Sequence, residues 1–238
     1  MSNQDSHKNL KNINSLCSCI EFSGDHCDDF LNNLLISDLK TFNPNTFHYS
    51  ALCNPKGRII SSLWVNIIKS NHIQLICPKN MLEELVVFFN MRKFRLKINI
   101  EVSDIQILMA TNGSIFTQPK DENNHTKVTN LNLFYSILFN VNFPWINKEN
   151  TEKFIPQHVN LDQHDHVMSF KKGCYPGQEI IARMKFLGKI KKRMTVIENA
   201  SKDELINSVK SQNQVSPIIE SNGVYLVQSI EKITDDSE

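Results

Sequence analysis

The stretch FKKGCYPGQE, residues 170–179, holds more information about this chain than any other segment of similar length. Gly173 and Gly177 frame Cys174, and glycine permits positive φ and close approach of the backbone to another group. Two lysines precede the cysteine, and a helix is expected to begin just after the loop, with the positive end of its dipole near the thiol. These surroundings stabilise a thiolate, the form that attacks electrophiles. Among six cysteines, Cys174 alone is predicted to be reactive and required.

Three neighbours of the cysteine are candidates for supporting its chemistry. Lys172 is expected to tune the thiol, because a nearby ammonium group favours the thiolate. Gln178 and Glu179 can orient the thiol or form hydrogen bonds with a ligand. The alternative is a tight turn that contains an ordinary cysteine. The combination of Gly, Cys, Gly, Gln and Glu in one loop favours the functional interpretation.

Composition and charge narrow the class of protein. The chain has 238 residues, 40% of them hydrophobic, which is enough for one large or two small domains with a buried core. The formal net charge of +1 is too small for the overall electrostatic potential of the protein to attract nucleic acid or membranes. A local basic run at 185–193 could bind RNA phosphates or the carboxylates of a polyglutamylated folate. A solvated turn accounts for this run equally well.

No targeting or membrane segment is apparent in the sequence. No apolar run reaches the roughly 18 residues that a membrane-spanning helix needs, and residues 1–14 lack the apolar core of a signal peptide. The expected location is therefore the cytoplasm, where most of the irregularly spaced cysteines would be buried thiols.

The pattern of apolar residues predicts an α+β fold of the ferredoxin-like type, in which two helices accompany several strands. Segment 118–129 is polar and is expected to be a loop. The expected elements are a strand at 16–22, a helix through 30–35 capped by Asp25, a hairpin of 47–53 and 58–68, a strand at 73–77, a helix at 81–90 capped by Asn80, a strand at 94–100, helices at 131–140 and 178–186, and strands at 192–197 and 224–233.

Several motifs resemble one known family, the YgfZ family of folate-binding proteins linked to tRNA modification and iron–sulfur protein maintenance. KGCYPGQE at 172–179 resembles the K-G-C-[FY]-x-G-Q-E signature of that family. FIPQHVNL at 154–161 and ARMKFLG at 182–188 are similar to the stretches on either side of the signature. CNPKGR at 53–58 resembles the C-x-x-K-G-[KR] hairpin turn. The match is strongest over residues 150–193.

The resemblance implies the fold of the folate-dependent aminomethyltransferases. Its parts would be ferredoxin-like subdomains, the second of them shortened near 118–129, and a small C-terminal β-barrel-like unit. Residues 1–186 would form the folate-binding domain that carries the Cys174 loop, and residues 187–238 a reduced β domain.

The resemblance also implies where folate would bind. The expected contacts are Phe134 and Asn140, with Arg183 and Lys185 holding anionic groups of the ligand. Phe134 stands where relatives have a folate-flanking tryptophan and keeps a stacking face, although its apolar run is also typical of a core. Asn140 replaces an acidic residue, which predicts weaker tetrahydrofolate binding. Cys17 replaces a second tryptophan.

One departure argues against aminomethyl transfer. The aminomethyltransferases carry a catalytic Asp pair in a hairpin, and the corresponding segment here is GRIISS, residues 57–62. A serine hydroxyl at Ser61 or Ser62 cannot supply the same base or charge at neutral pH.

No metal site is assigned. Cys17 and Cys19 would share one face of a strand, but no second pair completes a zinc ligand set. His158, His164 and His166 are interpreted as loop histidines, because no carboxylate or cysteine completes a ligand pattern among them.

Three functions remain open. The favoured one is a tetrahydrofolate-binding protein that supports iron–sulfur enzymes, among them tRNA-modifying ones, with transient RNA contact. The second is a folate-dependent one-carbon transferase with Cys174 as nucleophile. The third is a folate-free interaction protein in iron–sulfur assembly. In all three, Cys174 is expected beside a central cavity lined by Phe134, Asn140 and the hairpin 53–62.

Overall fold

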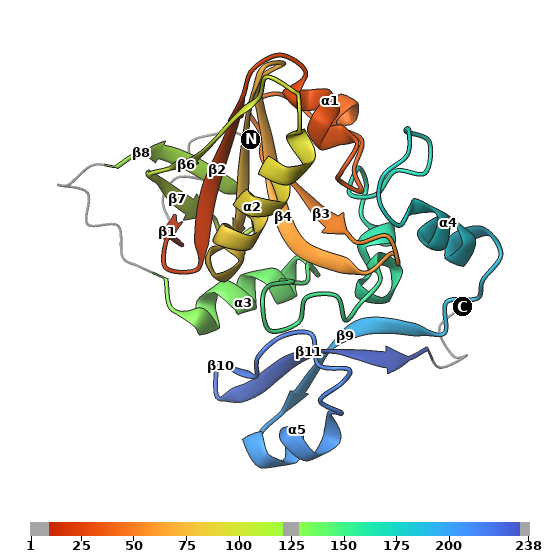
Figure 1. Cartoon of the computed structure of the whole chain (residues 1–238). Helices are drawn as coiled ribbons and strands as arrows, with labels where there is room; N and C mark the ends of the chain where they lie inside the picture. Colours follow the sequence, from red (N-terminus) through yellow and green to blue (C-terminus); the bar gives the residue numbers. More distant parts are fainter. Residues whose placement is uncertain (1–9, 121–128, 234–238) are drawn as a thin grey trace.

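The computed structural model describes residues 10–120 and 129–233 of the chain, and these residues form three antiparallel sheets with five α-helices (Figure 1). The strands are β1 (Lys11–Asn12), β2 (Cys17–Ser23), β3 (His48–Cys53), β4 (Ile59–Lys69), β5 (His72–Pro78), β6 (Asn99–Ser103), β7 (Ile105–Met109), β8 (Ile115–Pro119), β9 (Lys192–Asn199), β10 (Ile219–Ser221) and β11 (Val224–Lys232). The α-helices are α1 (Cys27–Asn32), α2 (Leu82–Lys93), α3 (Leu131–Asn140), α4 (Gln178–Phe186) and α5 (Lys202–Ser208). Short 3-10 helices cover Leu39–Thr41, Lys79–Met81, Pro156–Val159 and Leu161–Gln163.

The central sheet has five strands in the order β3-β4-β5-β2-β6. Both of its faces are buried along β2, β3, β4 and β5, so apolar side chains occupy both sides of these strands, whereas the edge strand β6 is mostly exposed. In β2, Ile20 and Phe22 belong to the core cluster that α1 and α2 cover. Cys17 and Cys19 belong to the cluster on the other face, because successive side chains of a strand point to opposite sides.

The second face of the central sheet packs against α3, against the three-stranded sheet β1-β7-β8 and against the irregular segment that follows α3. Phe134, Tyr135 and Trp145 are buried in this layer. The fold class is therefore α+β, as the sequence predicts.

The C-terminal part of the described chain is a small antiparallel sheet in the order β10-β11-β9, accompanied by α5. It lies below α3 in Figure 1, and the helix α3 contacts β10. A division of the chain after residue 186 stays a prediction. Helix α4 ends at Phe186 and β9 begins at Lys192, so the predicted boundary falls in the short connection between them.

Several predicted elements need correction. The first helix begins after His26, which adopts a left-handed conformation with φ 65°, so Asp25 is not its cap. Asn80 donates a hydrogen bond to Glu149 instead of capping α2. The strand expected at 94–100 starts only at Asn99, because the chain turns after α2.

The polar segment expected to be a loop begins inside a strand. Gln118 and Pro119 belong to β8, where Gln118 donates to Gln106 of the neighbouring strand β7. Residues 121–128 of this predicted loop lie outside the described residues. The sequence prediction also missed β1, β7, the strand character of β8, α5 and β10.

Candidate functional site

The loop that carries Cys174 rests on the turn of the β3-β4 hairpin. Gly177 adopts a left-handed conformation, φ 81°, and stands directly before α4. A Cβ atom at Gly177 would lie 2.5 Å from the carbonyl oxygen of Asn54 and 2.6 Å from Cα of Gly57. Glycine is therefore required at this position both for its conformation and for the close approach of two backbones. The predicted proximity of the loop and the hairpin is confirmed.

Tyr175 fixes the same loop from the inside. Its side chain is 5% exposed and belongs to the main core cluster. Burial raises the pKa of the Tyr175 phenol, with Cys53 of the hairpin contributing. The backbone oxygen of Tyr175 accepts a hydrogen bond of 3.1 Å from the Gln178 amide. One loop residue is thus buried while its neighbour Cys174 is exposed.

Lys172 contacts the protein backbone. Its Nζ donates to the carbonyl oxygens of Asn32, Leu35 and Ser37, with a distance of 2.6 Å to Ser37. Three acceptors match the three N–H groups of an ammonium ion. Burial lowers the pKa of Lys172 to about 8. The structure therefore gives Lys172 an anchoring contact that ties the loop to the end of α1, in addition to the tuning role that stays a prediction.

We expect Lys172→Met to destabilise the protein by about 2–4 kcal/mol, because it leaves carbonyl groups in a half-buried site without a donor. Methionine keeps the length of the aliphatic stem, so packing is largely retained. Urea unfolding monitored by circular dichroism measures the change. Lys171→Met is the matched control, since Lys171 is exposed and should change stability by less than about 0.5 kcal/mol. Equal effects of the two substitutions would contradict the anchoring role.

Cys174 is the exposed cysteine of the six, and the other five are buried. An added Cβ at the preceding residue, Gly173, would meet no atom within 4 Å. The thiol therefore stands on an open part of the loop, where a macromolecular partner can reach it.

Four of the remaining predicted site residues lie on α4. Glu179 and Arg183 pair with each other across one helical turn at 3.1 Å, and both side chains are mostly exposed. Lys185 places its Nζ 4.4 Å from the centre of the Phe170 ring. Gln178 is half-buried at the start of the helix. These four side chains thus share one helix next to the Cys174 loop.

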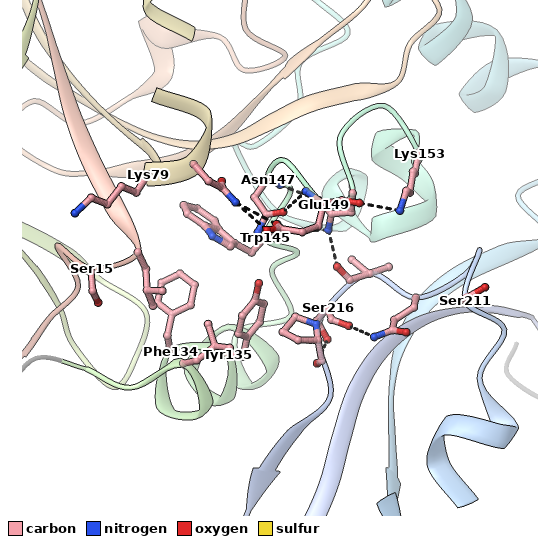
Figure 2. Close-up of a pocket in the computed structure, with 17 residues that line it drawn as sticks. Ser15, Lys79, Phe134, Tyr135, Trp145, Asn147, Glu149, Lys153, Ser211 and Ser216 are labelled. Carbon is pink, nitrogen blue, oxygen red and sulfur yellow. Dashed lines mark hydrogen bonds between the residues drawn. The ribbon is translucent and has the colours of Figure 1, made fainter. Parts of the chain in front are cut away.

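A cavity of about 640 Å³ opens elsewhere, between α3, the segment after α3 and the C-terminal unit (Figure 2). Its aromatic wall consists of Phe134, Tyr135 and Trp145, with the Phe134 and Trp145 rings 5.3 Å apart. The other lining residues are Ser15, Leu16, Lys79, Asn80, Leu131, Asn147, Glu149, Asn150, Lys153, Ser211, Gln214, Val215, Ser216 and Pro217.

The cavity contains a carboxylate that is held in place. Both oxygens of Glu149 accept hydrogen bonds from Asn80, at 3.0 and 3.2 Å. Burial raises the pKa of Tyr135, and the charge of Glu149 adds to this effect. Lys79 and Lys153 supply positive charge at the same cavity. The cavity therefore combines aromatic, anionic and cationic groups.

The sequence predicts one cavity beside Cys174, lined by Phe134, Asn140 and the hairpin 53–62. This prediction is wrong for the cavity described above, because only Phe134 of these residues lines it. Phe134 lines the cavity, whereas Asn140 is exposed at the last position of α3 and does not line it. The Cys174 loop does not line it either, because Gly177 seats the loop on the hairpin turn.

The hairpin serines that replace the Asp pair have a structural role. Ser61 and Ser62 are both fully buried. The hydroxyl groups of Ser62 and Tyr49 share a hydrogen bond of 2.5 Å, and the Ile146 amide donates to Ser62 at 2.8 Å. These contacts connect the central sheet to the segment beside the cavity.

The other residues considered for metal binding are dispersed. Cys17 and Cys19 share a buried face, as predicted. His164 contacts the backbone oxygen of Asn142 at 3.1 Å. Across residues 10–120 and 129–233, no three His, Cys, Asp or Glu side chains gather closely enough to hold a metal ion.

Sequence reasoning missed Tyr135, Trp145 and Glu149. Tyr135 directly follows the predicted Phe134, and Trp145 is one of the two tryptophans of the chain, so a search for aromatic residues would have identified both. Glu149 had no signal, because its partner Asn80 is 69 residues away.

Comparison with known proteins supports one family. No family model matches the chain. The "tRNA-modifying protein YgfZ" of Blochmanniella pennsylvanica is 26% identical over 205 residues, which cover 66% of this chain and 62% of that protein. The protein of the same name from Photorhabdus laumondii is 35% identical over 89 residues, 37% of this chain and 27% of that one. The chain therefore spans less than two thirds of the length of the Blochmanniella relative.

A shorter match has higher identity. The Escherichia coli protein named "tRNA-modifying protein YgfZ" is 44% identical over 59 residues, 25% of this chain and 18% of that one.

Among the described residues, no helix is both long and apolar enough to cross a bilayer.

The fold has a counterpart among solved structures. The glycine cleavage system aminomethyltransferase T from Bartonella henselae superposes with a TM-score of 0.61 at 10% identity, covering 94% of this chain and 78% of that one. This likeness establishes the aminomethyltransferase fold. In sequence, the chain is similar to several proteins named "tRNA-modifying protein YgfZ", as its motifs predict.

Proposed function

We propose that this chain is a cytoplasmic, tetrahydrofolate-binding protein that supports iron–sulfur enzymes, among them tRNA-modifying ones, through an exposed Cys174 and transient contact with RNA. The observation that carries the proposal is the cavity of about 640 Å³, which combines an aromatic wall with a positioned carboxylate. Its volume lies within the roughly 300–1,000 Å³ typical of ligand sites.

The chemistry of the cavity residues fits a folate. A pterin is a flat aromatic ring with an amine edge, so Phe134, Tyr135 and Trp145 would provide the apolar walls. Glu149 would accept hydrogen bonds from the amine edge, the charge-assisted contact that Asn140 cannot supply from its exposed position. Lys79 and Lys153 would bind the carboxylates of the glutamate tail.

The position of Cys174 favours a supporting role over one-carbon transfer. A nucleophile has to come within bonding reach of the transferred carbon. None of the loop residues 170–179 lines the cavity, so a folate bound there would not meet the thiol directly. Cys174 would instead act on a partner at the surface. The buried serines at 61 and 62 likewise disfavour aminomethyl transfer.

The two proposed domains would cooperate in this function. The cavity takes lining residues from α3 and also from the segment 211–217. The reduced C-terminal unit, residues 187–238, would thus complete the folate site that residues 1–186 begin.

We expect tetrahydrofolate to bind without turnover, and Glu149→Gln to weaken binding by about tenfold, the cost of replacing a charge-assisted hydrogen bond with a neutral one. Isothermal titration calorimetry measures both values. Asn140→Glu is the matched control, because Asn140 lies outside the cavity, and its affinity should equal that of the wild type.

Other outcomes of the titration would select the alternative functions. Turnover of a one-carbon donor that requires Cys174 would support the transferase. Absence of folate binding, with an iron–sulfur assembly partner that co-purifies, would support the folate-free interaction protein. A gain of affinity in Asn140→Glu would contradict the assignment of the ligand site to this cavity.

A further inference from the structure

The segment around α4 concentrates positive charge to a degree that the whole chain does not. Residues 171–193 hold eight of the 26 Lys and Arg residues and one of the 25 Asp and Glu residues. The rest of the chain therefore carries 18 basic against 24 acidic residues and is negative overall. A protein with a formal net charge of +1 thus has one strongly basic segment.

Two of these basic residues serve the fold. Lys172 binds three backbone carbonyls, and Arg193 forms a two-pronged ion pair with Asp162 at 2.5 and 3.0 Å. The other six basic side chains of the segment are exposed, and they are Lys171, Arg183, Lys185, Lys189, Lys191 and Lys192.

The hairpin turn adds two more exposed cations to the same surface, Lys56 and Arg58. An added Cβ on Gly57, between them, would lie 3.2 Å from Cβ of Ile180 on α4, so the turn and the helix are in contact. Arg58 donates a hydrogen bond to the backbone oxygen of Lys153, and Arg193, which follows Lys192, donates one to the backbone oxygen of Gln157, so both ends of the surface contact the segment 153–157. We call these eight exposed cations the basic face.

Apolar side chains are interleaved with the basic face. Phe186, the last residue of α4, is 67% exposed, and Leu187 after it is 83% exposed, although the same helix buries Ile181. The Phe186 ring packs on one side against Phe170, with centroids 5.7 Å apart. An aromatic ring supported in this way offers a platform on which a base can stack.

We propose that the basic face binds the phosphate backbone of an RNA strand, with Phe186 as a stacking platform and Cys174 at the edge of the bound strand. Six of the eight cations are lysines, and lysine is depleted in protein–protein interfaces, so the composition favours a polyanion over a protein partner. That the polyanion is RNA rests on the proposed function. The surface then brings an RNA substrate and the Cys174 thiol to the same side of the molecule.

Fluorescence anisotropy with a labelled single-stranded RNA of about 20 nucleotides tests this proposal, because such a strand exceeds most single-strand site sizes. Contact with about four phosphates predicts that affinity falls about 50-fold when salt rises fourfold. The triple variant Lys189→Glu, Lys191→Glu, Lys192→Glu should lose at least about tenfold in affinity and flatten the salt dependence. Phe186→Ala should lose at least about fivefold.

The matched control is the triple variant Lys69→Glu, Lys202→Glu, Lys210→Glu, which changes the net charge equally at exposed positions outside the basic face. It should retain most of the affinity. Equal losses in the two triple variants, or no RNA binding by the wild type at low salt, would overturn the proposal. Binding of poly-glutamate as tight as that of RNA would replace it with an acidic protein partner.

Tetrahydrofolate titration of the same variants separates this proposal from the proposed function. The basic face lies outside the cavity, so its charge-reversal variants should bind tetrahydrofolate as the wild type does. A wild type that binds RNA at this face but does not bind tetrahydrofolate would remove the folate function and leave the RNA surface standing.

Discussion

Replacing Cys174 with alanine is expected to abolish the function of this protein while leaving its fold intact. The side chain is exposed, so its removal takes little from the core. The readout is restoration of tRNA thiomethylation and of iron–sulfur enzyme activity in cells that lack the protein. Cys174→Ser keeps the size and the hydrogen-bonding capacity of the side chain, and it should fail as well if the thiol chemistry is what matters. Full rescue by Cys174→Ala would leave the loop with a structural role only.

Alkylation of the native protein provides the chemical counterpart of this experiment. Burial raises the pKa of Cys27 to about 11 and that of Cys77 to about 12, and it also raises the pKa values of Cys17, Cys19 and Cys53. At pH 8, a thiol with a pKa of 11 is a thiolate in only about 0.1% of molecules. Peptide mass spectrometry after a brief reaction should therefore find Cys174 labelled first. Simultaneous labelling of Cys27 would contradict this.

Features that depend on local sequence could be predicted here. The hairpin turn at 54–57 follows from its Pro and Gly, and α3 and α4 follow from apolar spacing and from Gly177 before the helix. The motif at 170–179 likewise identified the loop that the fold presents. In each of these cases, the residues that give the signal lie within a few positions of the feature that they predict.

Features that depend on distant partners could not be predicted. The carbonyl groups that hold Lys172 belong to residues 135 to 140 positions earlier in the chain. The cavity combines side chains from the turn before β2, from α3 and from the segment before β10, and no local pattern marks that combination. Asn140 is a case in which a sequence position predicted a ligand contact that the structure does not show. It is the last residue of α3, and its side chain is exposed to solvent.

Gly177 belongs to both kinds of feature. The local sequence identifies it as a turn glycine, but the contact that requires a glycine there is with a distant part of the chain, the hairpin turn. The carbonyl oxygen of Asn54, which would lie 2.5 Å from an added Cβ, also accepts the hydrogen bond from the Gly57 amide that closes the hairpin turn. Backbone atoms on both sides cannot move independently, so a side chain at Gly177 has to separate the loop from the hairpin.

We therefore expect Gly177→Ala to destabilise the protein by at least about 3 kcal/mol, of which roughly 1–2 kcal/mol comes from the left-handed conformation and the rest from the contact. Gly173→Ala is the matched control in the same loop. A Cβ at Gly173 meets nothing within 4 Å, so stability should change by less than about 0.5 kcal/mol. Urea unfolding measures both. Similar stabilities of the two variants would show that the loop is not seated on the hairpin, and the position of Cys174 would then no longer follow from the fold.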